Sequence, residues 1–574
     1  MGRPKVIELL VSVENLTVRY ELLDGNTFNA LTGISMRINR GQIVGVVGES
    51  GAGKSTIGKA ALGLLDENAV IESGNIKLDD SVLTQYTERD FAPIRGKRIG
   101  YIYQNPMTAL NPVLTIGEQL IETIQAHTDK RGQVARNFAI ELLKKVEIFD
   151  AETRLSKYPH QLSGGLCQRI VFAIAICSKP DLIIADEPTT ALDVTIQKAV
   201  LDTFKQLAQK ENIAVILITH DMGVVAEMCD YVYVLRHGLL VEHGPTQHIL
   251  MNPKETYSRE LMAAIPRVDQ KIDRFLVPGI IQNSEGRDRA LTFLNRKVQG
   301  QNWEQTSPLL SVRKLSKTFI SPATLVSSKK SFKAVDSVSF DVFKGETLGI
   351  VGESGSGKST IGRMILGLLN PDYKTDIDSN VIYRGVNISD LKTRAERHGI
   401  CQSMQCIFQD PYSSLNPRMS AGENITFAVK AHGAIPRSKA WELAADLMEL
   451  VGLPRNATGK MPHAFSGGER QRIGIARALS FQPDFMFCDE PTSALDVTVQ
   501  AKLLNLIKDL QDALGLTLVF VSHDLAVVRQ MCNRVLVMKS GQVVESGTTE
   551  KILGSPDNIY TKELLNSMPR FTFQ

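Results

Sequence analysis

The sequence of 574 residues contains no apolar run long enough to cross a membrane, since runs such as Ile170 to Cys177 fall far short of the ~20 residues that a spanning helix needs. We therefore expect the chain not to cross a membrane by itself. A large excess of one charge is also missing, because 65 basic and 62 acidic residues leave a net charge of +3. Proteins that follow nucleic-acid phosphates need a basic excess, so nucleic acid is not an expected partner.

Cysteine is sparse as well: the chain has seven, scattered without the spacing of a disulfide framework. An odd, scattered set fits a reducing cytosol better than an oxidising compartment. The closest pair, Cys401 and Cys406, has no matching Cys or His pair elsewhere in the sequence. We therefore expect no zinc site.

An internal repeat organises the chain. The segment Gly48 to Thr56 recurs as Gly352 to Thr360, and Lys358 follows Lys54 by 304 positions. Near-constant offsets indicate duplication of a whole domain, and a single core rarely grows beyond about 250 to 300 residues. We expect a first domain at 1–265, a mostly irregular linker at 266–307, and a second domain at 308–574.

Within each copy, short apolar runs alternate with helical patterns, which indicates an α/β fold with buried strands. In the first copy we expect strands at Ile43 to Val47, Leu182 to Ala185 and Ala214 to Thr219. Amphipathic patterns at Ile116 to Gln125 and Ala135 to Val146 predict a helical subdomain inserted between Gln104 and Ser163.

A G-x-x-x-x-G-K-[ST] loop follows an apolar strand and opens a helix in both copies, which is the context that a P-loop requires. The loops consist of Gly48, Glu49, Ser50, Gly51, Ala52, Gly53, Lys54, Ser55 and Thr56, and of Gly352, Glu353, Ser354, Gly355, Ser356, Gly357, Lys358, Ser359 and Thr360. Glycines let backbone N–H groups converge on phosphate at a helix N-terminus. We expect the lysines to contact the β and γ phosphates of ATP, and the Ser55 and Ser359 hydroxyls to bind Mg²⁺.

In each copy, an Asp-Glu pair follows one apolar strand and a histidine follows a later one. Asp186 and Asp489 fit a Mg²⁺ shell, whereas Glu187 and Glu490, one residue later, fit a carboxylate that orients or deprotonates the attacking water. His220 and His523 end later strands. A lone histidine there is more often structural, but two in register with two P-loops favour a γ-phosphate contact.

Ser163, Gly164 and Gly165, with Ser466, Gly467 and Gly468, lie between the P-loop and the Asp-Glu strand and resemble the signature motif of ATP-binding-cassette ATPases. The resemblance covers nearly the whole chain and implies two tandem P-loop domains of that type. Gln104 and Gln409 resemble the family's glutamine loop, which also contributes to the Mg²⁺ site. The loops at 191–193 and 494–496 follow the catalytic Glu, and Tyr20 and Phe319 fall where the family stacks an aromatic ring on adenine.

The resemblance further implies that two such domains enclose two ATP molecules, each between one P-loop and the other domain's signature. Lys54 would then face Ser466, and Lys358 would face Ser163. The first signature continues with Leu166 and Cys167 where the second has Glu469 and Arg470. We expect Arg470 to add positive potential near the nucleotide, and hence two competent sites of unequal rate.

The segments around Tyr257 and Tyr560 are similar to the tails of oligopeptide and dipeptide importer ATPases, although the usual His-Pro before the tyrosine is absent from both. A plain amphipathic capping helix is the alternative for these tails. The resemblance implies an ATPase subunit of a bacterial importer of peptides or peptide-like solutes, peripheral at the cytoplasmic face of the inner membrane. Its partners would be two permease subunits and an external solute-binding protein. The alternative is a soluble tandem ATPase acting on the ribosome or on nucleic acid; the transported solute stays open.

Overall fold

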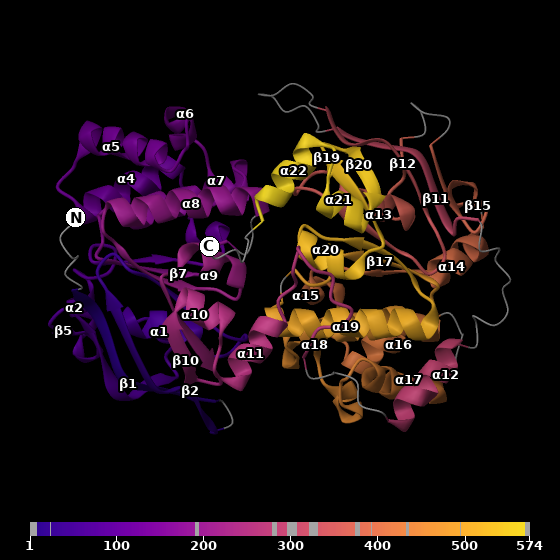
Figure 1. Cartoon of the computed structure of the whole chain (residues 1–574), viewed down its shortest axis with the longest axis horizontal. Helices are drawn as coiled ribbons and strands as arrows, with labels where there is room; N and C mark the ends of the chain where they lie inside the picture. Colours follow the sequence, from indigo (N-terminus) through magenta and orange to yellow (C-terminus); the bar gives the residue numbers. More distant parts are fainter. Residues whose placement is uncertain are drawn as a thin grey trace. The chain divides into compact units, whose positions relative to one another are not determined.

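The computed structural model describes residues 8–22, 25–189, 194–277, 284–295, 307–320, 331–372, 379–391, 393–431, 436–493 and 495–568. The chain forms two compact units, Met1–Ala263 with Ser567–Gln574 and Ala264–Asn566 (Figure 1). Each unit contains one six-stranded and one four-stranded sheet with helices around them. The expected α/β architecture is therefore confirmed in both copies.

The first unit orders its sheets β10-β9-β3-β8-β7-β6 and β2-β1-β4-β5. Its strands are β1 (Leu9–Glu21), β2 (Thr27–Asn39), β3 (Ile43–Val47), β4 (Ala69–Leu78), β5 (Ser81–Val82), β6 (Ile99–Ile102), β7 (Leu182–Asp186), β8 (Ala214–Ile218), β9 (Tyr231–Arg236) and β10 (Leu239–Pro245). Its helices are α1 (Lys54–Ala61), α2 (Glu88–Phe91), α3 (Pro106–Ala109), α4 (Ile116–His127), α5 (Gly132–Lys145), α6 (Ala151–Leu155), α7 (Gly164–Ile176), α8 (Val194–Lys210), α9 (Met222–Met228), α10 (Thr246–Met251) and α11 (Thr256–Ala263).

The second unit repeats this order as β16-β17-β18-β13-β19-β20 and β12-β11-β14-β15. Its strands are β11 (Leu310–Ile320), β12 (Ser331–Val342), β13 (Thr347–Val351), β14 (Asn380–Tyr383), β15 (Val386–Asn387), β16 (Met404–Ile407), β17 (Phe485–Asp489), β18 (Thr517–Val521), β19 (Arg534–Lys539) and β20 (Gln542–Thr548). Its helices are α12 (Glu285–Asn295), α13 (Lys358–Ile365), α14 (Arg394–Ser403), α15 (Pro411–Ser414), α16 (Ala421–Ala431), α17 (Arg437–Leu450), α18 (Gly467–Leu479), α19 (Val497–Leu514), α20 (Leu525–Met531), α21 (Thr549–Gly554) and α22 (Ile559–Asn566).

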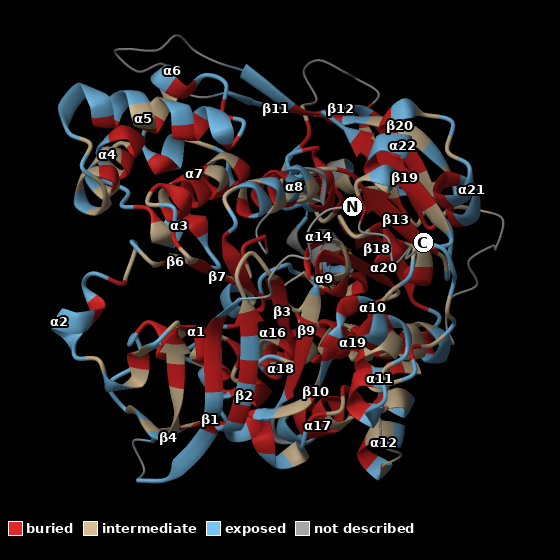
Figure 2. Ribbon diagram, turned by 60° about the vertical axis from the view of Figure 1, so that its left-hand side comes forward, coloured by how far each residue is buried: buried red, intermediate tan, exposed pale blue. Residues whose placement is uncertain are grey.

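The central strands form the buried middle of each unit. β3 pairs in parallel with β8 and β9, and all five of its residues are buried (Figure 2). A strand buried on both faces reads as a continuous apolar run, which explains why Ile43–Val47 could be predicted from sequence. Because the strands run in parallel, the residues that follow β3, β7 and β8 meet at one edge of the sheet.

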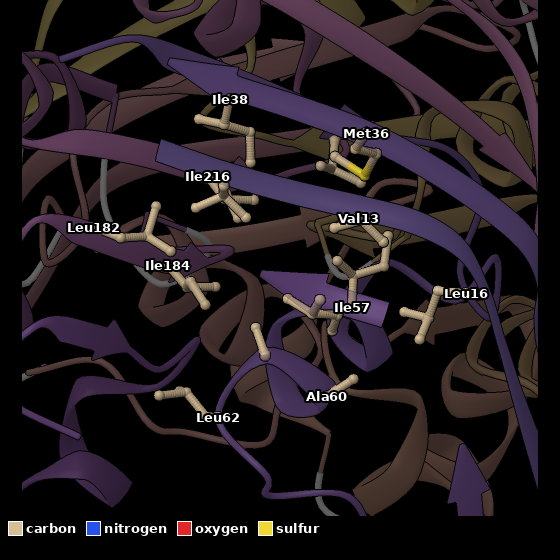
Figure 3. Packing of buried hydrophobic residues seen from close by; sticks show 14 of the residues in the cluster. Val13, Leu16, Met36, Ile38, Ile57, Ala60, Leu62, Leu182, Ile184 and Ile216 are labelled. Carbon is tan, nitrogen blue, oxygen red and sulfur yellow. The ribbon is translucent and has the colours of Figure 1, made fainter. Parts of the chain in front are cut away.

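A hydrophobic cluster holds the P-loop helix in place in the first unit. Ile57, Ala60 and Leu62, from α1 and the residue after it, pack with Leu182 and Ile184 of β7 (Figure 3). Strands β1 and β2 of the other sheet close the cluster. The core of the α/β sheet and the antiparallel sheet is thus continuous, and α1 begins at a fixed place above it.

The predicted helical insert is present. Ile116–His127 and Gly132–Lys145 form α4 and α5, which pack against each other and against α7. Thr115 and Glu118 form a capping box that begins α4 at its predicted position. No helix among the described residues is both long and apolar enough to span a bilayer.

The segment expected to be a mostly irregular linker contains helix α12 and is bound to the second unit. Arg274 contacts Asp509 at 3.1 Å, and Arg289 contacts Asp446 at 2.8 Å. Helix α12 packs on α17 and α19. It has only a narrow apolar face, with Ala290 and Leu294 four residues apart, so its sequence pattern was too weak to predict it. Whether the domain boundaries fall at 265 and 307 stays a prediction.

Candidate nucleotide sites

Glycines shape each P-loop. Gly48 has φ +149°, and a Cβ there would lie 2.2 Å from the Leu235 carbonyl oxygen. Gly53, with φ +93°, is the N-cap of α1 and leaves the first N–H groups of the helix without a side-chain cap. Uncapped N–H groups at a helix N-terminus attract anions. The loop therefore fits a phosphate chain, and Gly352 and Gly357 repeat these conformations in the second unit.

The P-loop lysines are almost buried and donate to their own loops. Lys54 Nζ contacts the carbonyl oxygens of Gly48 at 2.8 Å and Glu49 at 2.9 Å. Lys358 contacts the equivalent oxygens of Gly352 and Glu353, both at 2.8 Å. Both ammonium groups are thus held over the loop into which phosphate would bind.

The serine and aspartate that we assigned to Mg²⁺ lie together in both units. Ser55 Oγ donates to Asp186 at 3.0 Å, and Ser359 Oγ donates to Asp489 at 3.0 Å. Burial raises the pKa of Asp186 and that of Asp489 above the usual aspartate value. The described residues contain no group of three or more His, Cys, Asp and Glu that could hold a metal alone. One carboxylate and one hydroxyl suit Mg²⁺, which normally takes its remaining ligands from phosphates and water.

The structure brings the proposed catalytic glutamate of the first unit together with two other predicted residues. Gln104 Nε2 donates to Glu187 Oε2 at 2.7 Å, and His220 Nδ1 lies 3.0 Å from Oε1. Burial lowers the pKa of His220, but the hydrogen bond and charge of Glu187 outweigh it, so this pKa lies above its usual value. Glu187 itself adopts φ +46°, a left-handed conformation that a non-glycine residue rarely takes and that is often found at functional sites.

The second unit repeats this arrangement with a small difference. Gln409 Nε2 donates to Glu490 Oε2 at 2.9 Å, and His523 Nδ1 lies 3.3 Å from the same oxygen. Burial raises the pKa of Glu490, but the hydrogen bond and charge of His523 lower it below its usual value. Three residues distant in sequence therefore meet in each unit, at the sheet edge that the strand order predicts.

The two signature helices begin differently. Ser466 Oγ accepts from the Glu469 backbone N–H, and the Glu469 carboxylate accepts from the Ser466 backbone N–H, whereas Ser163 makes no side-chain cap. Arg470 is buried, donates to the Pro462 carbonyl at 2.7 Å, and stacks on a tyrosine ring of its own unit. Its guanidinium is therefore engaged within its own domain, and its contribution to the potential at the nucleotide stays a prediction. In the structure, the two signatures differ in whether a side chain caps the N-terminus of the helix.

The proposed adenine-stacking residues are aromatics near strand ends, Tyr20 half-buried and Phe319 exposed. Tyr20 stacks on Phe28 with ring centroids 5.5 Å apart, and Phe319 is 44% exposed. Residues 191–193 and 494, which belong to the predicted loops after the catalytic Glu, lie outside the described residues.

Sequence reasoning missed two contacts to these sites. Tyr101 of β6 donates its hydroxyl to Asp186 at 2.9 Å. Tyr257 of α11 accepts a hydrogen bond from the backbone N–H of Glu49 in the P-loop at 3.2 Å. An aromatic residue in a strand is usually a packing residue, and no side-chain pattern reveals a bond to a backbone N–H. The sequence held no signal for either contact.

Comparison with known proteins agrees with this geometry. The family model described as "ABC transporter" matches residues 31–190 and 335–493, and the model "Oligopeptide/dipeptide transporter, C-terminal region" matches residues 241–291 and 544–574.

The glutathione import ATP-binding protein GsiA of Escherichia coli strain K12 is 39% identical, over 98% of this chain and 89% of its own length. The protein of that name from Salmonella typhimurium is 38% identical over the same shares. A solved dimeric structure of the ATP-binding cassette MJ0796 bound to ADP and Pi is 27% identical, with a TM-score of 0.38, and covers 41% of this chain and 99% of its own. The chain belongs to the ABC transporter family, as an ATP-hydrolysing protein with two nucleotide-binding domains, each followed by a region of the oligopeptide/dipeptide transporter type.

Proposed function

We propose that the chain is the ATPase subunit of a bacterial importer for peptide-like solutes, with glutathione as the first solute to test. The observation that carries this proposal is the full-length similarity to glutathione import ATPases, combined with an oligopeptide-type region after each nucleotide-binding domain. The partners would be two permease subunits and an external solute-binding protein. The chain would then be a peripheral protein at the cytoplasmic face of the inner membrane.

ATP would bind at both P-loops. Lys54 and Lys358 already donate to carbonyl oxygens of their own loops, and an ammonium group has three N–H donors, so a phosphate oxygen can join these acceptors without a large movement of the side chain. The uncapped N-termini of α1 and α13 add N–H donors. Tyr20 and Phe319 would stack on adenine.

Mg²⁺ would be held by Ser55, Asp186 and Gln104 in the first unit, and by Ser359, Asp489 and Gln409 in the second. The ion would neutralise charge on the phosphates. The Ser–Asp bonds support this assignment, because each serine places its oxygen beside the carboxylate.

Glu187 and Glu490 would orient the attacking water and accept its proton. A base must lie within hydrogen-bond reach of that water, and the surrounding donors fix where each carboxylate points. Gln104 and His220 hold the two oxygens of Glu187, and His220 would also contact the γ-phosphate. In the second unit Gln409 and His523 both hold Oε2 of Glu490, and His523 would likewise contact the γ-phosphate.

Each ATP would also contact the signature of the other domain, so that Lys54 faces Ser466 and Lys358 faces Ser163. Gly164, Gly165, Gly467 and Gly468 would supply backbone N–H donors to the γ-phosphate. The N-terminus of α7, without a side-chain cap, and that of α18, with a capping box, make the two sites chemically unequal. This inequality supports two active sites with different rates.

Uptake of labelled glutathione and of a labelled dipeptide would test the proposal in cells that lack the chain. Wild-type protein should restore uptake, whereas the double variant Glu187→Gln/Glu490→Gln should not. Restored uptake of the dipeptide alone would replace glutathione as the solute. Normal uptake of both without the chain would contradict the importer assignment and favour the ribosome or nucleic-acid alternative.

A further inference from the structure

One tyrosine in the C-terminal region of each domain reaches the P-loop. Tyr257 of α11 and Tyr560 of α22 are only 5% and 6% exposed. The Tyr257 hydroxyl accepts a hydrogen bond from the Glu49 backbone N–H at 3.2 Å, and Tyr560 accepts one from Glu353 at 3.2 Å. The same bond therefore occurs in two domains whose tails differ in sequence.

The peptide group involved is the one that also contacts the P-loop lysine. Its N–H belongs to Glu49 and its oxygen to Gly48, and that oxygen accepts from Lys54 Nζ at 2.8 Å. The ammonium and the phenol are thus joined through a single peptide plane. Hydrogen bonds in such a chain polarise one another, so the tyrosine oxygen makes the Gly48 carbonyl a better acceptor. The second unit repeats the chain through Gly352, which accepts from Lys358 at 2.8 Å.

The loop needs an anchor at this point because it begins with a glycine. Gly48 has φ +149° and Gly352 has φ +147°, a conformation that other residues rarely adopt. A Cβ on either would lie 2.2 Å from a backbone carbonyl oxygen of the neighbouring strand end. A side chain at this position therefore cannot hold the peptide; the loop lysine holds its oxygen, and the tyrosine holds its N–H from outside the loop.

A cation lies over the ring of each tyrosine. The Arg236 guanidinium lies 4.5 Å from the ring centroid of Tyr257, and Lys539 Nζ lies 4.3 Å from that of Tyr560. A cation over an aromatic face is attracted by the ring electrons.

A carboxylate holds the turn just before each tail helix. Glu242 accepts from the backbone N–H groups of Lys254 at 2.8 Å and Glu255 at 3.2 Å. Glu545 does the same for Asp557 at 2.8 Å and Asn558 at 3.3 Å. Each carboxylate therefore fixes the backbone just before the helix that carries the tyrosine.

We propose that Tyr257 and Tyr560 are positioning residues for nucleotide binding. Each holds the Gly–Glu peptide of its P-loop, and through it the P-loop lysine, in the geometry that phosphate requires. The C-terminal region is therefore part of the ATP site as well as an appendage of the domain. This inference rests on the proposed assignment of both P-loops as ATP sites.

The variants Tyr257→Phe and Tyr560→Phe, singly and together, keep the rings and remove the hydroxyls. We expect the double variant of the full chain to bind ATP with Mg²⁺ about 2- to 12-fold more weakly, the range for loss of a single hydrogen bond. KM for ATP should rise in proportion, while kcat stays within about twofold, because the bond acts before the chemical step. Tyr231→Phe is the matched control: it removes a hydroxyl that contacts His243 at 2.8 Å, and it should leave ATP affinity unchanged.

Unchanged ATP affinity in the double variant, with normal binding by the wild type, would overturn the positioning role and leave the proposed function intact. A wild-type chain that does not bind ATP would contradict the proposed function instead. A lower melting temperature without nucleotide, with KM unchanged, would show a purely structural role and also overturn the inference. If the double variant does not fold, the single variants provide the same comparison.

Discussion

Tyr101 donates its hydroxyl to Oδ2 of Asp186 at 2.9 Å. Tyr101 pairs with Ile184 on β7, and the residue at the matching place in the second unit is Cys406, which pairs with Phe487 on β17. Asp186 thus accepts hydrogen bonds from the hydroxyls of Ser55 and Tyr101. The strand beside Asp489 has the thiol of Cys406 at the position of Tyr101. The two proposed Mg²⁺ sites differ at a position that no motif includes.

Removing the Tyr101 hydroxyl should strengthen Mg²⁺ binding in the first unit. In Tyr101→Phe the ion no longer competes with a hydroxyl donor for the Asp186 oxygen. We expect the Mg²⁺ concentration for half-maximal ATPase activity to fall about 2- to 12-fold, the range for one hydrogen bond. Tyr103→Phe, on the adjacent exposed ring, is the control. A higher Mg²⁺ requirement would mean that Tyr101 orients the carboxylate instead.

Substituting the proposed base should separate ATP binding from hydrolysis. Glu187→Gln and Glu490→Gln should bind ATP like the wild type, because the glutamates lie outside the phosphate loop. Each should slow single-turnover hydrolysis at its own site about 10²- to 10⁴-fold, the usual contribution of a general base. Loss of ATP binding in either variant would argue that the carboxylate holds the loop.

The P-loop lysines should affect binding directly. Lys54→Ala removes a charged donor to phosphate, so we expect about 12- to 150-fold weaker ATP binding at that site, the range for hydrogen bonds to charged groups. Lys77→Ala is the control, because Lys77 pairs with Glu14 on the antiparallel sheet. Isothermal calorimetry on the full chain would measure both. Equal affinities for these two variants would contradict the assignment.

Asp446 should stabilise the second unit through the linker. Its carboxylate side chain is 7% exposed and accepts from Arg289 at 2.8 Å and also from Arg455. Asp446→Ala should lower the free energy of unfolding of this unit by about 1–3 kcal/mol, since it removes charge-assisted bonds. It should also speed proteolysis of residues 284–295. Asp288→Ala, on the exposed face of α12, is the control; equal proteolysis of the two would contradict a docked helix.

The tail turn should be sensitive to acid through Glu242. Burial raises the pKa of this carboxyl, but the nearby Ser258 hydroxyl and hydrogen bonds from two backbone N–H groups lower it below its ordinary value of 4.5. A lowered pKa in the folded state gives stability that is complete above the ordinary pKa and is lost as the pH falls through the folded value. Glu242→Gln should therefore have a free energy of unfolding about 1 kcal/mol below that of the wild type at pH 7. This difference in stability should shrink below pH ~4.5, as thermal melting at several pH values would show. Glu255→Gln, with an exposed side chain, should follow the wild type at every pH.

The sequence predicted what depends on local or repeated patterns. The strand at Ile43–Val47 was predicted because it is buried on both faces, and the duplicated motifs placed the same residues at the sheet edge in both units. Gln104 and Glu187 are 83 positions apart, and it was the resemblance of Gln104 to the glutamine loop of ATP-binding-cassette ATPases that assigned both to one site.

Contacts to backbone groups could not be predicted in this way. The bond from the Glu49 backbone N–H to the Tyr257 hydroxyl spans 208 positions. Its donor is a backbone group, which no pattern of side chains reveals. Helix α12 depends on Asp446, 157 positions beyond Arg289, so its sequence alone looks polar and irregular. The buried orientation of Arg470 likewise follows from its neighbours in the fold.

The linker contacts also bear on how the protein folds during synthesis. Arg274 is made 235 residues before its partner Asp509. At about 5–20 residues per second, this segment waits roughly 12–47 s outside the ribosome before its binding surface exists. Residues 1–263, the main part of the first unit, have been made by then, whereas the second unit ends its synthesis with this segment already available to bind. Slow translation between these points would lengthen the exposure of Phe275, which is buried in the folded protein.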